Sequence, residues 1–118
     1  MATTQVAKQN TTKPNTVTPF TFTSVAAGND AIIDASGKDE RTLIIVQNAS
    51  SSDDATLTIK HGDGYGGVND ITAKVAKSTF AAFTLDSTVF KNTTGANKGK
   101  YVISTDKAVS IAVVEAKV

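Results

Sequence analysis

Few side chains in this sequence could carry out acid–base or nucleophilic chemistry. The 118 residues include a single histidine, His61, only two glutamates and no cysteine. A catalytic triad needs a nucleophile, an imidazole and an orienting carboxylate. The nucleophile motif Gly-x-Ser-x-Gly is absent, and His61 stands where an alternating apolar pattern meets a glycine-rich turn. We therefore expect a structural histidine at a strand end and a protein that is not an enzyme.

Asp63 and Asp70 are the candidates for a metal site. They lie in residues 62–70 (GDGYGGVND), where carboxylates and glycines resemble parts of a calcium-binding loop. An EF-hand needs oxygen ligands at alternate positions and a final Glu, and a glycine-rich calcium roll needs tandem copies. Both requirements are unmet, so a connection rich in positive φ angles explains the segment better. We expect no metal and no cofactor, with calcium as the secondary interpretation.

Three further side chains are candidates for contacts with other molecules. Tyr65 lies at the tip of the same loop and could stack on a sugar ring, which leaves a carbohydrate-binding or adhesive module open. Lys98 and Lys100 lie in GANKGK and could form a basic rim that meets an acidic patch on a partner protein. The alternative for these lysines is a solvated loop.

The composition indicates strands. The chain has 18 Thr, 12 Val and 8 Ile against 3 Leu, and a second heavy atom on Cβ suits a pleated sheet and crowds a helical turn. No apolar run approaches the roughly 20 residues that span a bilayer, and no signal-peptide core follows Met1. We therefore expect no membrane partner and assembly in the cytoplasm. The net charge of +1 gives no reason to expect nucleic acid.

Residues 1–17 (MATTQVAKQNTTKPNTV) are predicted to form a flexible or extended N-terminal arm before a single β domain over residues 18–118. The segment is polar and lacks aromatic residues, so it cannot offset the entropy of ordering by itself. It is either a terminus without an ordered partner or an arm that orders across a neighbouring protein. In the second case deletion of residues 2–17 should weaken attachment and leave the fold intact. The candidate contact residues are Thr4, Gln5, Lys8, Gln9 and Lys13.

From Pro19 onward, short alternating segments are separated by turn residues at a spacing of roughly 8–12 residues. Residues 41–48 (RTLIIVQN) have apolar residues on both faces, which predicts a central strand covered on both sides. Phe80 and Phe83 break strict alternation, so we expect a bulge or a strand with two apolar faces. Asp106 and Lys107 are predicted to form a tight hairpin between the last two strands.

These patterns predict an all-β fold: an antiparallel Greek-key or jelly-roll-like β sandwich or barrel of about eight strands, with an extended N-terminal arm. The core is small because the chain has few large aromatic residues and no disulfide. A core of this size would gain from contacts between subunits, which favours a homo-oligomer; a self-sufficient monomer is the alternative.

Three stretches resemble the small virion proteins of tailed bacteriophages, most closely the capsid decoration (head-stabilising) proteins. They are DERTLIIVQNAS, GDGYGGVNDI, and TVFKNTTGANKGKYVIST followed by AVSIAVVE. The resemblance covers about residues 39–115 and implies a noncatalytic protein on the outside of the virion. It further implies a homo-oligomer, with a trimer favoured, that binds the major capsid protein and clamps adjacent capsid subunits. A phage tail or neck component remains the alternative within this class.

Overall fold

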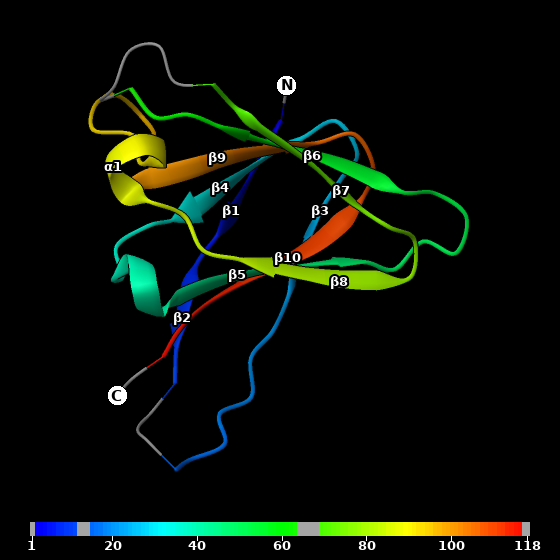
Figure 1. The fold of residues 1–118 in the computed structure, drawn as a ribbon, viewed down its shortest axis with the longest axis horizontal. Coiled ribbons are helices and arrows are strands. Elements are labelled where there is room, and N and C mark those ends of the chain that lie inside the picture. Colours follow the sequence, from blue (N-terminus) through cyan, green and yellow to red (C-terminus); the bar gives the residue numbers. More distant parts are fainter. Residues whose placement is uncertain (1, 12–14, 64–68, 117–118) are drawn as a thin grey trace.

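Two packed β-sheets form the molecule (Figure 1). The computed structural model describes residues 2–11, 15–63 and 69–116. Sheet A contains, in spatial order, β1 (Thr3–Val6), β4 (Asp30–Asp34), β9 (Lys100–Thr105), β6 (Ala55–Lys60) and β7 (Ile71–Val75). Sheet B contains β2 (Lys8–Asn10), β10 (Val109–Glu115), β5 (Thr42–Asn48) and β8 (Thr79–Phe83), and β3 (Thr23–Val25) also pairs with β10.

The prediction of an all-β fold is confirmed. Residues 18–118 supply the strands from β3 to β10, and the N-terminal segment adds β1 and β2. Two short helical turns, η1 (Asp39–Arg41) and α1 (Ser87–Phe90), lie in connections between the sheets. None of the helices in the described ranges is long and apolar enough to cross a membrane.

The core lies between the sheets and is filled by the inward-pointing residues of each strand. In β5, Ile44 and Val46 are fully buried, whereas the intervening Ile45 is half-buried. In β6, Leu57 is buried and its neighbours in sequence are threonines that face outward. Tyr101 packs in the same core, as the sequence predicts, and burial raises the pKa of its phenol to about 12. The Tyr101 phenol therefore stays neutral at ordinary pH.

The N-terminal segment is extended, and it pairs with the sheets of its own chain. β1 runs parallel to β4 at the edge of sheet A, and β2 runs parallel to β10 at the edge of sheet B. Val6, the last residue of β1, is 3% exposed and belongs to the core. The sheets are therefore mixed, not purely antiparallel as expected. A polar segment can be ordered in this way because an open sheet edge offers it backbone hydrogen bonds.

The predicted hairpin at Asp106 and Lys107 is wrong. β9 belongs to sheet A and β10 to sheet B, so the connection at residues 106–108 crosses from one sheet to the other. The Asp106 side chain accepts a hydrogen bond from the Thr56 amide at 2.7 Å, which fixes the crossing to β6. A short polar connection has the same composition in both geometries, so the local sequence could not distinguish them.

Candidate interaction surface

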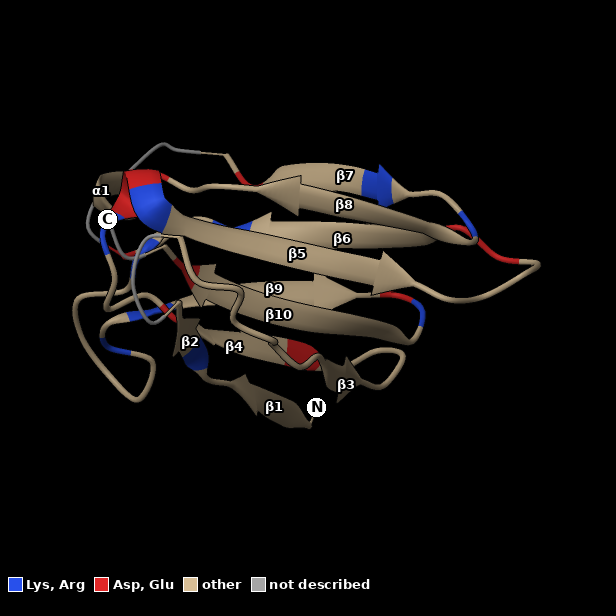
Figure 2. Ribbon diagram, turned by 90° about the horizontal axis from the view of Figure 1, so that it is seen from below, with Lys and Arg blue, Asp and Glu red and all other residues tan. Residues whose placement is uncertain are grey.

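The outward side of sheet B has no charged side chain over β10, β5 and β8 in the described part of the chain. Cross-strand partners in a sheet share a face, and the pairings place Leu43 beside Val114, and Gln47 beside Phe80 and Ser110. In Figure 2 the ribbons of β5, β8 and β10 are mostly tan, and the charged residues gather toward strand ends and loops. The outward residues of these strands are Leu43, Ile45, Gln47, Phe80, Ala82, Ser110, Ala112 and Val114.

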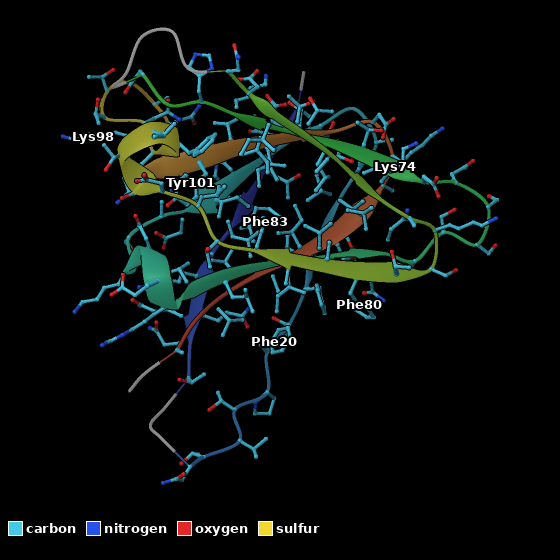
Figure 3. The ribbon with its side chains drawn as sticks, in the orientation of Figure 1. Phe20, Lys74, Phe80, Phe83, Lys98 and Tyr101 are labelled. Carbon is cyan, nitrogen blue, oxygen red and sulfur yellow. The ribbon has the colours of Figure 1, made fainter. Side chains whose placement is uncertain are left out.

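Phe80 is the most exposed aromatic residue of this surface, at 64%. Residues 79–83 pair one-to-one with residues 44–48, so β8 contains no bulge and has two apolar faces. Phe83 packs against the core, whereas Phe80 points away from it (Figure 3). The break in alternation therefore marks an apolar side chain placed on the outside.

Two phenylalanines from the segment before β3 extend the surface. The Phe22 ring centroid lies 6.2 Å from that of Phe80 and 5.5 Å from that of Phe20. Both distances are in the range of favourable aromatic pairs. Phe20 is 41% exposed and lies, with Phe80, below sheet B in the view of Figure 3. We call the outward residues of β5, β8 and β10, together with Phe20 and Phe22, the apolar face.

The expectation that residues 41–48 are covered on both sides is wrong for this face. β5 is central in the hydrogen-bonding order, between β10 and β8, but Leu43 is 39% exposed. β5 does have apolar residues on both faces, but those on its outward face, Leu43 and Ile45, are not covered by another layer of the described structure. Exposed apolar patches of this kind mark protein interaction sites in soluble proteins.

The outward side of sheet A is more polar, although Ile32 and Val102 also lie on it. Thr58 and Lys60 of β6 and Lys74 of β7 lie on it. Asp30 of β4 accepts a hydrogen bond from the Ser104 hydroxyl at 2.7 Å and lies 3.9 Å from the Lys60 ammonium. The two faces of the sandwich therefore differ in chemistry, and the apolar one is the better candidate for a functional surface.

The residues predicted as contacts of the N-terminal arm are mostly used within the chain. The Lys8 ammonium lies 2.8 Å from a Glu115 carboxylate oxygen. The Gln9 side-chain amide donates to the Thr21 carbonyl and accepts from the Thr21 amide, as a paired strand would. Thr4 lines a shallow hollow of about 510 Å³, and Gln5 is exposed on sheet A. Lys13 lies outside the described residues.

The ion pair between Lys8 and Glu115 is largely buried and joins β2, β10 and the loop before η1. The two side chains are 16% and 11% exposed, and the second Glu115 oxygen accepts a hydrogen bond from the Lys38 amide at 2.8 Å. A Cβ on Gly37 would come within 2.5 Å of the Thr42 hydroxyl and 2.9 Å of the Glu115 carboxylate. Glycine at position 37 therefore lets the loop before η1 close over the ion pair.

The candidate calcium ligands belong to separate hydrogen-bonded loops. Asp63 accepts bonds from the amides and hydroxyls of Thr93 and Thr94, and these hold the pKa of its carboxyl well below the usual value. Asp70 accepts from the His61 amide at 2.9 Å and lies 2.6 Å from His61 Nδ1, and its pKa is also lowered. Across the described ranges, no three metal-ligating side chains gather in one place.

The glycine-rich loop differs from the expectation at its one described glycine. Gly62 does not adopt a positive φ; its missing Cβ allows close approach to the carbonyl of Lys91. The remaining glycines of the loop, and Tyr65, lie outside the described residues. The sugar-stacking role expected of Tyr65 therefore stays a prediction.

Lys98 and Lys100 occupy different surroundings. Lys98 is exposed in the turn before β9 (Figure 3), whereas Lys100 is half-buried in β9 opposite Asp34. Burial alone would raise the pKa of Asp34, but the hydrogen bonds from Ser36 and the charge of Lys100 lower it on balance. Lys100 therefore has an internal electrostatic partner, and the predicted basic rim reduces to Lys98 and its loop.

Sequence reasoning missed the apolar face as a site, although two signals pointed to it. One was the spacing of Phe80 and Phe83, and the other was the uncharged strand at residues 42–48. Comparisons of this chain with protein-family models, curated proteins and solved structures found no match.

Proposed function

We propose that this protein is a noncatalytic virion structural protein of the capsid decoration type, which attaches to the outer surface of a capsid through its apolar face. The main support for this proposal is that the apolar face has no charged residue and that Phe80, its most exposed aromatic residue, is 64% exposed. Aromatic residues are enriched and charged residues depleted at the centre of protein–protein interfaces. The resemblance to decoration proteins supplies the class of partner, a major capsid protein.

The titratable side chains support a role without catalysis. His61 and Asp70 bind each other, and Asp63 is engaged by two threonines. Tyr101 is buried with a raised pKa. Each of these groups has a structural role in a loop or in the core. Assembly, in contrast, needs only complementary surfaces.

The energetics favour attachment by many copies. Full burial of a side chain such as Phe80 or Leu43 contributes about 1.5–3 kcal/mol. Bringing one protein onto another costs an estimated 4–15 kcal/mol in lost freedom of motion. A face of this size therefore binds weakly as a single copy, and linked copies on a repeating lattice gain from avidity. A homo-oligomer on the virion surface is the form we propose.

Cosedimentation with capsids tests the proposal. The protein is coexpressed with the major capsid protein encoded in the same genome, and the fraction that sediments with assembled capsids is measured. We expect wild-type protein in the capsid fraction and at least about tenfold weaker binding of Phe80→Ser, which corresponds to about 1.4 kcal/mol. Lys74→Ser, an exposed change on the outward side of sheet A, is the matched control and should bind like wild type.

Several results would contradict the proposal. Wild-type protein that stays out of the capsid fraction removes the capsid as the partner, and cosedimentation with isolated tails assigns the tail or neck alternative. Equal binding of wild type and Phe80→Ser removes the apolar face from the contact. Urea unfolding of both variants confirms that they fold, because exposed substitutions usually change stability by no more than about 0.5 kcal/mol.

A further inference from the structure

The outer edge of β8 is an open strand edge. In the described part of the chain β8 pairs only with β5. The backbone amides and carbonyls along its other edge therefore have no partner strand. At the opposite side of sheet B, β2 and β3 share the edge of β10. In sheet A, β1 covers the edge of β4. The N-terminal strands thus pair with the edges of β4 and β10, whereas the outer edge of β8 has no strand partner in the described part of the chain.

β8 lacks the features that normally protect an edge strand. Natural edge strands are kept from pairing by lysine, proline, bulges or very short length. β7, which forms one edge of sheet A opposite the β1 edge, carries the exposed Lys74. β8 is a regular strand without a charge, a proline or a bulge, and the two residues after it, Thr84 and Leu85, are also uncharged. Of these two edges, β8 is the one suited to pairing with another strand.

We infer that β8 pairs in antiparallel orientation with β8 of a second copy of this chain. A two-fold axis at Ala81, the middle residue of Thr79–Phe83, would place Phe80 of each copy opposite Ala82 of the other. Both residues point outward, so the apolar faces of the two copies become one continuous surface. The interface is isologous, as in most dimers, and backbone hydrogen bonds supply its register.

The charges that flank β8 fit this orientation. Lys77 precedes the strand, Asp86 follows it, and both side chains are exposed. Within the described ranges the Lys77 ammonium forms no ion pair; its backbone amide donates to Asp54. In the antiparallel pair, the end of β8 that follows Lys77 lies beside the end of the other copy's β8 that precedes Asp86, so opposite charges flank each end of the interface. A parallel pair would set like charges side by side, which is unfavourable.

The pairing builds on the proposed function, since a dimer doubles the apolar surface that one attached unit offers to a capsid. It differs from the trimer implied by the family resemblance. Sedimentation equilibrium of the full chain alone distinguishes the two. We expect a mass of two subunits; a mass of one subunit at millimolar concentration, or of three subunits, overturns the inference.

Single-cysteine variants test the edge itself, because the chain contains no cysteine. Facing residues of an antiparallel pair have Cα atoms about 4.5–5.5 Å apart, within the range of a disulfide. Under mild oxidation we expect Ala81→Cys to form a covalent dimer. Ala73→Cys is the control, since Ala73 is equally half-buried in the middle of β7, and it should stay monomeric. Crosslinking of Ala73→Cys with none in Ala81→Cys overturns the assignment to β8.

A charge on the outward side of β8 should break the dimer. Ala82→Lys sets a lysine opposite Phe80 of the second copy, and we expect the dimer dissociation constant to rise at least about tenfold. An unchanged constant contradicts the pairing. Because these measurements use the protein alone, their outcome is separate from the proposed function. A dimer that does not attach to capsids contradicts only that function, whereas a monomer that attaches contradicts only the pairing.

Discussion

Glu115 illustrates how one residue joins distant parts of this chain. It lies at the end of β10, and its carboxylate holds the Lys8 ammonium through one oxygen and the Lys38 amide through the other. Removing one partner of a largely buried ion pair leaves the other charge without compensation, which costs more than the pair itself contributes. The N-terminal strand β2 is therefore held by a charge as well as by backbone hydrogen bonds.

Lys8→Met tests this contact. The substitution keeps most of the length of the side chain and removes its charge, so the buried Glu115 carboxylate loses the ammonium group that faces it. We expect the free energy of unfolding in urea to fall by about 2 kcal/mol. Lys98→Met removes an exposed lysine and should change it by no more than about 0.5 kcal/mol. Equal effects of the two substitutions would show that the ion pair contributes nothing specific.

Asp63 gives a prediction about pH. The largest cause of its lowered pKa is the hydrogen bond from the Thr94 hydroxyl. Because the folded pKa lies below the usual 3.8, ionised Asp63 stabilises the fold above about pH 4, and this contribution is lost as the pH falls through the folded pKa. Thr94→Val should raise the pKa of Asp63 measured by NMR titration. Thr72→Val, on exposed β7, should leave it unchanged; the same shift in both variants would contradict the assigned cause.

At the scale of elements, the N-terminal strands are integral to the fold. The sequence alone predicts that deletion of residues 2–17 leaves the fold intact, but β1 and β2 cover the edges of β4 and β10 and bring Val6 into the core. We now expect deletion of residues 2–10 to lower the free energy of unfolding by on the order of 2–4 kcal/mol, from the loss of Val6 burial and the ion pair. Urea unfolding of the shortened chain measures this, and a stability equal to wild type would restore the free-arm interpretation.

The sequence predicted most strands because alternation and β-branched residues are local signals. β5, β6 and β9 lie close to where the patterns place them. It did not predict which sheet each strand joins, because the turn between β9 and β10 looks the same for a hairpin and for a crossing. The role of Phe80 was hidden for a similar reason: local spacing shows that Phe80 and Phe83 lie on opposite faces, but only the packed sheets show which face is covered.

At the scale of the whole molecule, the two sheets present different chemistry to the surroundings. The outward side of sheet A carries lysines, aspartates and threonines that hydrate well, whereas the apolar face of sheet B carries phenylalanine, leucine and isoleucine. A sandwich with one polar and one apolar face binds another protein in a single orientation. Its apolar face is buried in the contact, and its polar face stays in the solvent. This asymmetry suits a protein that covers the surface of a larger assembly.

The dependence of attachment on salt follows from this asymmetry. The net charge is only +1, and the outward residues of β5, β8 and β10 that form the proposed contact are uncharged. Ionic strength screens charge pairs and leaves apolar burial intact. Raising sodium chloride from low to several-fold physiological concentration should therefore change the capsid affinity by less than about twofold, whereas sulfate should strengthen it. Quantitative cosedimentation across the salt series measures this. A tenfold loss at high salt would move the contact to charged groups such as the exposed Lys98 loop, because only a contact made by charges weakens in that way.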